Sequence, residues 1–262
     1  MYDYITGQET YQFVVNTYQH RAFIALYTRL VLFLRRKKMI LIFGMSRSGT
    51  SMLAEFLAMG RSSIYLHEPD SELMKKYYTK DHPFRQMLFW NFVNADEQKA
   101  FKVHLLNCIL LRSALKSDRA TRVICIKPIA LLNVMPEIIQ ARNIKVLYIS
   151  RHPAGRSESI LRQLQHDVGV QSIPLEKVEE LGRDWGKANR QAQEWFTSHP
   201  RWRWVIFENL ANDPLGEFKK LYADLGLAWE DGIEQAIRQK TTGEDGDFYE
   251  TKRDASKQAD KW

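Results

Sequence analysis

The stretch 40-ILIFGMSRSGTSML-53 decides the expected fold of this chain. Four apolar residues lead into Gly44, four residues intervene, and a second glycine, Gly49, follows. This is the outline of a phosphate-binding loop, in which Gly-x4-Gly is followed by Lys and then by Ser or Thr. Here Thr50 stands at the lysine position, and a basic residue, Arg47, lies inside the loop. We therefore expect the loop to hold an anion other than the triphosphate of a nucleotide.

The segments on either side of this loop have the patterns of a strand and a helix. Residues 39–43 form a short, wholly apolar run, typical of a strand that is buried on both faces of a parallel sheet. Residues 50–59 carry Leu53, Phe56 and Leu57 on one helical face. Backbone N–H groups and the positive end of a helix dipole then converge on the loop, which predicts an anion site.

Short apolar runs alternate with helical patterns along the rest of the chain. The runs lie at residues 123–126, 145–149 and 203–207, and helices are expected at 129–142 and 214–227. This alternation predicts an α/β fold, with a parallel sheet flanked by helices in a single domain over residues 1–262. Ligands of such sheets bind at the carboxyl ends of the strands. Polar residues that follow the apolar runs are therefore the candidate site.

The amino-acid composition restricts the class of protein and the kind of ligand only loosely. A chain of 262 residues, 45% hydrophobic and 26% charged, is an ordinary globular protein. The formal charge of +7 suits an anionic ligand. No RNA-binding motif accompanies the basic residues, so we expect no nucleic-acid partner. The histidines lack metal-ligand spacing, and no metal site is expected. Cys108 and Cys125 lie in apolar runs, which predicts buried, reduced thiols in a cytoplasmic protein.

The N-terminal segment, residues 1–37, is expected to be helical. Within it, 22-AFIALYTRLVLFLRRKK-38 is apolar and then basic, and Arg29 interrupts the apolar part. The run is shorter than the roughly 20 residues that span a membrane. Two interpretations stay open: a helix that covers the domain, or a basic amphipathic segment on an anionic membrane surface.

Residues 70–120 are rich in aromatic residues and lysines. We expect helices and loops that cap an edge of the sheet. This segment either packs in the ordinary way, with solvated lysines, or supplies the wall of an acceptor site.

A second polar cluster lies in 147-LYISRHPAGRSESIL-161. Arg151 follows a predicted strand, Pro153 begins a helix at the position that tolerates a missing N–H, and Ser159 lies two turns into it. An arginine beside a helix N-terminus, with a serine on that helix, predicts a second anion pocket. An arginine that bridges to a carboxylate is the structural alternative.

Together these segments resemble the PAPS-dependent sulfotransferases, where PAPS is 3′-phosphoadenosine-5′-phosphosulfate. The likeness rests on GMSRSGTS after an apolar strand, on RHP with a serine eight residues after the arginine, and on the late segment FENLANDPLGEFKKLYADLGLAW. It covers residues 39–60, 123–161 and 181–229 and is closest to the carbohydrate and tyrosyl-protein branches. Arg-Asp-Pro is usual where this chain has Arg-His-Pro, and the next arginine is displaced to Arg156.

The resemblance implies that the first loop cradles the 5′-phosphosulfate and that the second cluster holds the 3′-phosphate. The residues that would bind PAPS are Ser46, Arg47, Ser48, Gly49, Thr50, Ser51, Arg151 and Ser159. The transferred sulfuryl group bears one negative charge, so backbone N–H groups and one or two cations can stabilise its transfer without a metal. Arg47 is placed to neutralise charge on the bridging oxygen as its bond to sulfur breaks.

Three residues are candidates for the acceptor side. In the resembling family, a glutamate at the position of Glu68 is the base or orients the acceptor. His67 is the alternative base, because its unperturbed pKa of about 6.5 suits proton transfer, and a carboxylate that caps a turn is the structural alternative. Lys127, followed by proline, looks like the family's Lys-Pro element, whose ammonium reaches the sulfonate; a structural ion pair is the alternative. The catalytic candidates are thus Arg47, Glu68 and Lys127.

The expected activity is therefore sulfuryl transfer from PAPS to a hydroxyl acceptor. The Glu68-Pro69 pair and the N-terminal segment favour a carbohydrate or glycolipid, with a peptide tyrosine or a small metabolite as alternatives. A P-loop kinase or NTPase would need a lysine at position 50. We expect a cytoplasmic protein, with peripheral membrane contact through residues 22–38 left open. Ser256 and Lys257 are further candidate contacts to the 3′-phosphate.

Overall fold

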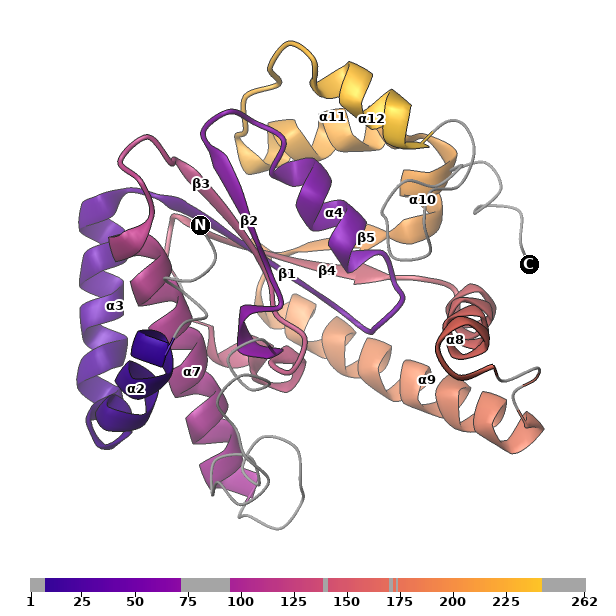
Figure 1. Cartoon of the computed structure of the whole chain (residues 1–262), viewed down its shortest axis with the longest axis horizontal. Helices are drawn as coiled ribbons and strands as arrows, with labels where there is room; N and C mark the ends of the chain where they lie inside the picture. The colour runs from indigo at the N-terminus through magenta and orange to yellow at the C-terminus, as the bar shows by residue number, and fades with distance from the viewer. Residues whose placement is uncertain (1–7, 72–94, 139–140, 170–171, 173, 242–262) are drawn as a thin grey trace. The chain divides into compact units, whose positions relative to one another are not determined.

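The computed structural model describes residues 8–71, 95–138, 141–169, 172 and 174–241 (Figure 1). The chain divides into two compact units. The first unit comprises Met1–Phe43 and Arg61–Lys145, and the second comprises Gly44–Gly60 and Val146–Trp262. Each unit is described by itself, and the single domain expected over the whole chain stays a prediction.

Parallel strands form a five-stranded sheet in the order β2-β3-β1-β4-β5. Their bounds are β1 Lys38–Gly44, β2 Ser63–His67, β3 Val123–Lys127, β4 Ile144–Ser150 and β5 Arg203–Ile206. The apolar runs of β1, β3 and β4 are buried, as expected for strands covered on both faces. The predicted α/β class, a parallel sheet flanked by helices, is confirmed.

The register of the first unit brings two strand ends together. β3 pairs with both β1 and β2, with Val123 opposite Lys38 and Lys127 opposite His67. β2 and β3 therefore end side by side. Whatever follows His67 and Lys127 leaves the sheet at the same point.

Among the described residues of the first unit, the helices are α2 Gln8–Thr17, α3 Arg21–Arg35 and α7 Ala95–Lys116, with short 3-10 helices η1 Tyr18–His20 and η2 Leu132–Glu137. α3 and α7 lie side by side (Figure 1). Ile24, Val31 and Leu32 of α3 are buried. One face of the apolar segment 22–38 thus covers the unit, which is the first of its two interpretations.

In the described part of the second unit, the helices are α4 Thr50–Leu57, α8 Pro153–Val168, α9 Leu175–Ser198, α10 Phe207–Asn212, α11 Pro214–Leu225 and α12 Ile233–Thr241. α11 holds the end of α4: the Phe56 and Phe218 rings are 5.0 Å apart, and the Tyr222 hydroxyl donates to the Phe56 carbonyl at 2.7 Å. The carboxyl end of α4 is therefore fixed, and its N-terminus begins directly after the glycine loop.

Two details of the secondary structure differ from the sequence prediction. The helix expected at 129–142 is wrong, because the described residues of that range form only the 3-10 helix η2, with Pro136 inside it. Proline has no N–H and cannot continue an α-helix. β2 was not predicted, and most of its residues are only half-buried, so its apolar signal is weak. Cys108 and Cys125 are both buried and free, as predicted.

Candidate anion site and acceptor-side residues

The first feature of the site is a loop whose two glycines cannot be replaced without strain. A Cβ on Gly44 would lie 2.6 Å from the carbonyl oxygen of Ile149. Gly49 has φ 90°, and a Cβ there would lie 2.5 Å from the Phe207 ring. Glycine tolerates both the left-handed backbone and the close approach. The spacing of the Gly-x4-Gly motif therefore has a structural cause at both ends.

The second feature is the N-terminus of α4, which opens onto this loop. Gly49 is the N-cap, and the Leu53 amide donates to its carbonyl at 3.0 Å. The N–H groups of the first turn, including those of Thr50 and Ser51, have no acceptor inside the helix. Together with the helix dipole they favour an anion. Ser48 and Thr50 are buried beside it, and Ser46 is exposed.

Arg47 links the two clusters that the sequence singled out. Its backbone is in the left-handed region, at φ 68°. Its Nε donates to the Oγ of Ser159 on α8 at 2.9 Å. Residues 112 positions apart in sequence are thus in contact, and the predicted 5′ and 3′ clusters meet at this bond.

Arg151 follows β4 and is also directed at the loop. Its Nη1 donates to the Arg47 carbonyl at 3.3 Å, and its guanidinium carbon lies 4.3 Å from the centre of the Phe207 ring. Burial lowers the pKa of Arg151 to about 10. The group remains charged at neutral pH, in a position where water screens it little. The Trp185 indole donates to the Arg151 carbonyl at 2.7 Å and fixes the backbone there.

Arg156 is a site residue that the sequence analysis did not assign. Its Nε donates to the Ser46 carbonyl at 3.1 Å, and only 6% of the residue is exposed. Burial lowers its pKa as well. The displaced arginine of the RHPAGR segment was the signal that could have found it. Arg47, Arg151 and Arg156 together are called the arginine cluster below.

The histidine of the Arg-His-Pro departure has a structural role. His152 is the N-cap of α8, and its Nδ1 accepts from the Ala154 amide at 3.3 Å. The His152 amide in turn donates to Glu208 at 2.9 Å. A histidine can therefore replace the usual aspartate as a cap, and Glu208 ties the start of α8 to α10.

In the first unit, Glu68 and Lys127 form a partly buried ion pair. The Lys127 ammonium donates to Glu68 Oε1, and the Glu68 amide donates to the Lys127 carbonyl at 2.8 Å. The side chains are 16% and 8% exposed. Glu68 has a left-handed φ of 44°, which is uncommon for a residue other than glycine. The structure thus brings two of the three catalytic candidates into contact.

His67 lies at the edge of this pair. Its Nε2 is 3.7 Å from Glu68 Oε1, and its side chain is 48% exposed. The imidazole is therefore exposed to solvent on one side and lies near the carboxylate on the other. Its assignment as the alternative base stays a prediction.

A second acidic residue of this segment, Asp70, was also missed. It is fully buried, and its carboxylate accepts from the amides of Ile129 and Ala130 at 3.0 and 2.7 Å. Burial raises the pKa of Asp70 to about 6. These bonds fix the backbone that follows Lys127, so Asp70 positions the segment behind the ion pair.

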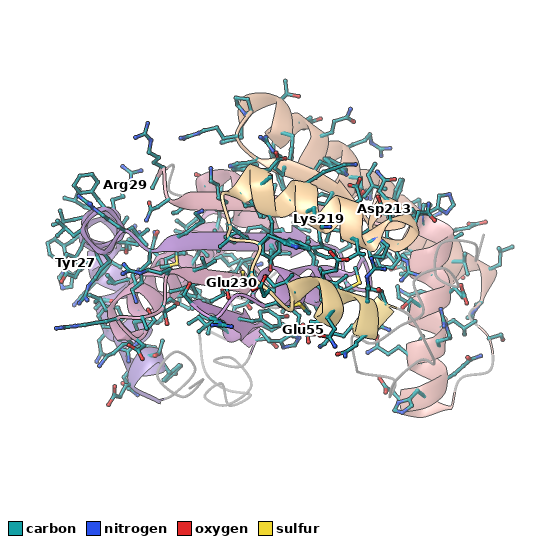
Figure 2. The ribbon with its side chains drawn as sticks, turned by 90° about the horizontal axis from the view of Figure 1, so that it is seen from above. Tyr27, Arg29, Glu55, Asp213, Lys219 and Glu230 are labelled. Atoms are coloured by element: carbon teal, nitrogen blue, oxygen red, sulfur yellow. The ribbon has the colours of Figure 1, made fainter. Side chains whose placement is uncertain are left out.

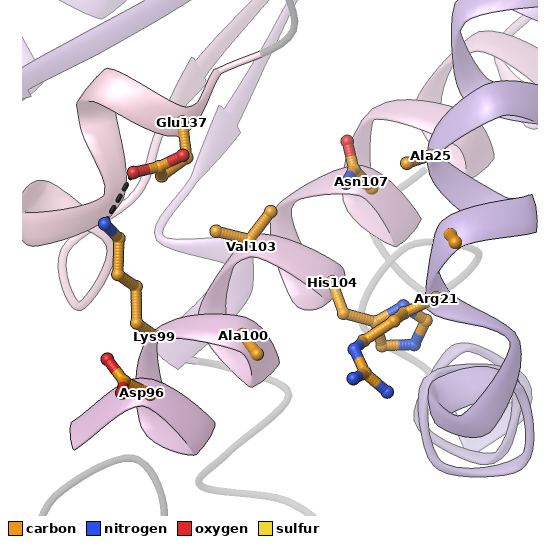
Figure 3. Close-up of a pocket in the computed structure, with 10 residues that line it drawn as sticks. Arg21, Ala25, Asp96, Lys99, Ala100, Val103, His104, Asn107 and Glu137 are labelled. Carbon is orange, nitrogen blue, oxygen red and sulfur yellow. Dashed lines mark ion pairs between the residues drawn. The ribbon is translucent and has the colours of Figure 1, made fainter. Parts of the chain in front are cut away.

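A cavity of about 360 Å³ lies elsewhere in the first unit (Figure 3). Its walls come from α3, α7 and the end of η2, and the Lys99 ammonium pairs with Glu137 at 2.6 Å on its rim. None of the predicted site residues lines it. The cavity is therefore separate from the ion pair of Glu68 and Lys127.

Several predictions lie beyond what the structure describes. Ser256 and Lys257, and residues 72–94 of the 70–120 segment, are outside the described residues. Within the described ranges, no three His, Cys, Asp or Glu side chains gather as metal ligands.

Comparison with known proteins places these motifs in one family. A model described as "Sulfotransferase family" matches residues 39–231. A search of curated proteins finds no match. Among solved structures, the chain is similar to the sulfotransferase STF1 from Mycobacterium tuberculosis H37Rv, with 14% identity and a TM-score of 0.50, over 87% of this chain and 75% of that one.

Two further structures are similar at lower TM-scores. Mouse sulfotransferase SULT7A1, complexed with PAP, shares 15% identity at a TM-score of 0.44, over 79% of this chain and 65% of that one. A retinol dehydratase in complex with retinol and PAP shares 14% identity at a TM-score of 0.44, over 78% of this chain and 64% of that one. The chain thus spans less than two thirds of the length of these two proteins.

Proposed function

The chain belongs to the sulfotransferase family, and we propose that it transfers a sulfuryl group from PAPS to a hydroxyl acceptor without a metal. The observation that carries the proposal is the arginine cluster around the Gly44–Gly49 loop. Bound PAPS supplies the sulfuryl group: the sulfur–oxygen bond to its phosphate breaks, a bond to the acceptor oxygen forms, and the acceptor proton goes to a base. Adenosine 3′,5′-bisphosphate, abbreviated PAP, is the other product.

On the nucleotide side, we assign Ser46–Ser51 to the 5′-phosphosulfate and Arg151 with Ser159 to the 3′-phosphate. The first assignment is supported by the amides of the α4 N-terminus and the hydroxyls of the loop. The second is supported by the buried, charged guanidinium of Arg151. Arg156, held on the Ser46 carbonyl, adds positive charge. Arg47 is assigned to neutralise the leaving oxygen, and the bond from its Nε to Ser159 orients its guanidinium.

On the acceptor side, we assign Glu68 as the base and Lys127 as the cation that reaches the sulfonate. The Lys127 ammonium donates to the Glu68 carboxylate, the group that we assign to take the acceptor proton. The pair also fixes the carboxylate in one direction. His67 is the alternative base, and its exposed ring near Glu68 supports a role in passing the proton to solvent.

The acceptor class is a separate proposal. A carbohydrate or glycolipid hydroxyl is favoured by Glu68 followed by Pro69, the pairing of the carbohydrate branch that the chain resembles. A peptide tyrosine or a small metabolite is the alternative. A cytoplasmic location is proposed from the two buried, free thiols.

The decisive experiment is calorimetric binding of PAP and of ATP, each measured with EDTA and with Mg²⁺. We expect PAP to bind equally well in both conditions and ATP to bind more weakly. Arg183→Ala is the matched control, since Arg183 is an exposed arginine of α9 outside the cluster. Binding of ATP that needs Mg²⁺, with hydrolysis, would favour the P-loop kinase or NTPase instead. Radiolabelled PAPS with panels of glycans, glycolipids, tyrosyl peptides and phenols then identifies the acceptor.

A further inference from the structure

Helix α3 has two apolar faces, although a helix on the surface of a globular protein needs only one. The inner face buries Ile24, Thr28, Val31 and Leu32 against the first unit. The Thr28 hydroxyl is satisfied there, because it donates to the Ile24 carbonyl at 2.7 Å. The residues that pack α3 on the unit thus lie on its inner face.

The outer face carries six large apolar side chains that are exposed. They lie three or four positions apart and so form one continuous stripe along the helix. Their exposed fractions range from 39% to 76%, and the residues are Phe23, Leu26, Tyr27, Leu30, Phe33 and Leu34. Single exposed apolar residues are normal, but a contiguous patch of this kind marks a site of interaction. We refer to these six residues as the α3 stripe.

The charged residues of the segment that carries the stripe all have one sign. Between Arg21 and Lys38 the chain has six basic residues and no acidic one. Arg29 lies on the flank of the stripe, and Arg35 and Arg36 lie at its carboxyl end. Figure 2 shows Tyr27 and Arg29 projecting outward from α3. The surface thus combines an apolar centre, with three aromatic rings, and a positively charged border.

We propose that the α3 stripe docks on an anionic lipid surface, with α3 lying along the membrane. Leucine and phenylalanine side chains would enter the boundary of headgroups and acyl chains, while the arginines contact lipid phosphates. The long arginine side chains can keep their charge at the headgroups while their stems cover apolar surface. This proposal concerns a different part of the molecule from the sulfuryl transfer and does not depend on it.

Charge selects the lipid surface over a second copy of the chain. Two stripes packed on each other would bring two sets of arginines together, and segment 21–38 offers no carboxylate to pair with them. Like charges opposed across an interface weaken it. An anionic membrane supplies the missing negative charge and accepts the apolar stripe at the same time.

The geometry fits a helix on the membrane rather than through it. Helix α3 has 15 residues. None of the described helices has the length and hydropathy needed to cross a bilayer. With its inner face packed on the unit, α3 can present only its outer face to lipid.

The test is sedimentation of the whole chain with vesicles of phosphatidylcholine plus phosphatidylserine, and with vesicles of phosphatidylcholine alone. The wild type should bind the anionic vesicles, and added salt should weaken the binding. The double variant Leu30→Asp/Leu34→Asp should bind at least about tenfold more weakly, because it removes apolar area and adds negative charge. Arg29→Glu/Arg35→Glu should lose about fivefold or more per arginine on anionic vesicles.

Matched controls exist on α9. Leu175 is 73% exposed, and the side chain of Arg183 is 60% exposed. Leu175→Asp and Arg183→Glu should bind vesicles as the wild type does. Thermal denaturation and PAP binding should be unchanged in all four variants, because none of these side chains is buried in the core or lies in the proposed nucleotide site.

Three outcomes would overturn the proposal. The wild type could fail to sediment with anionic vesicles. The stripe variant could bind as well as the Leu175→Asp control. Finally, the wild type could be a dimer that Leu30→Asp/Leu34→Asp converts to a monomer, with no vesicle binding in either form; the stripe would then be an interface between copies.

Discussion

The arginine cluster of the second unit and the ion pair of the first unit handle charge in opposite ways. Arg47 donates to a serine hydroxyl, and Arg151 and Arg156 donate to backbone carbonyls. Glu68 and Lys127 neutralise each other. The arginine cluster gathers positive charge around a loop. In the ion pair, the two opposite charges cancel each other.

This difference suits the arginine cluster to binding an anion and the ion pair to accepting a proton. Glu208 and Glu158 act on Arg151, and Asp184 acts on Arg156. The hydrogen bonds named above go to neutral oxygens, and an anionic ligand can add charge-assisted ones. An ion pair has no net charge to offer, but it holds a carboxylate in a fixed orientation. Substitutions in the two regions should therefore affect different measurements: nucleotide affinity responds to Arg151 of the cluster, turnover alone responds to the pair, and Arg47, beside the reacting group, acts mainly on turnover.

The largest effect is expected for Glu68→Gln. A positioned base typically contributes about 10²–10⁴-fold to the rate. Turnover of PAPS with a hydroxyl acceptor should fall by that factor, while the dissociation constant of PAP stays within about twofold, since no charge of the cluster changes. Steady-state kinetics and calorimetry on one preparation measure both.

The ion pair offers a control that separates chemistry from structure. Lys127→Met leaves the Glu68 carboxylate buried without its cation, which should cost about 1–3 kcal/mol of unfolding free energy. Adding Glu68→Gln removes the unpaired charge and should restore much of that stability. If the pair were only structural, the double variant would also regain activity. We expect it to remain inactive.

Arg47→Ala should have the next largest effect. Loss of a group that stabilises developing charge typically reduces turnover by about 10²–10³-fold. PAP affinity should change by less than about tenfold, because the interaction is concentrated in the transition state. Arg183→Ala, at an exposed position, controls for the loss of a positive charge from the same unit. Turnover of Arg47→Ala at the wild-type rate would refute this role for Arg47.

The sequence predicted the elements of the site better than the contacts between them. The strand–loop–helix at residues 38–57 follows from an apolar run, two glycines and an amphipathic helix, all of which are local signals. The bond from Arg47 to Ser159 depends on the left-handed backbone at position 47 and on where α8 lies. Neither can be read from residue spacing.

The failure to predict two site residues, Arg156 and Asp70, has the same physical explanation. Arg156 and Asp70 both bond to backbone groups of distant loops. Any backbone offers such groups, so the sequence of the partner loop carries no signal. The wrong helix at 129–142 was predicted from its apolar residues, while Pro136 and the Asp70 bonds favour a turn. Helical periodicity cannot detect a cap supplied by another segment.

Arg151→Ala should act mainly on binding. Removal of a charge-assisted bond to the 3′-phosphate should weaken PAP affinity by about 1.5–3 kcal/mol, with a smaller effect on turnover at saturating PAPS. Arg151→Lys keeps the charge but loses the planar guanidinium over Phe207, and should be intermediate. Unchanged affinity in Arg151→Ala would move the 3′-phosphate away from this residue.

The smallest effect on turnover is expected for Asp70→Asn. This variant tests, through the pH dependence of stability, whether the Asp70 carboxyl group anchors the turn that follows Lys127. Burial raises the pKa of Asp70 to about 6, from 3.8. Between these values the folded protein binds more protons than the unfolded chain, so the Asp70 contribution to stability falls as pH rises from about 4 to 6 and is constant above. Asparagine cannot ionise, and one amide bond to its carbonyl can persist. Urea denaturation across this range should therefore show a shallower decline for Asp70→Asn than for the wild type. Parallel curves would mean that the carboxyl group titrates as it does in the unfolded chain, and that it is not the buried anchor of the Ile129–Ala130 turn.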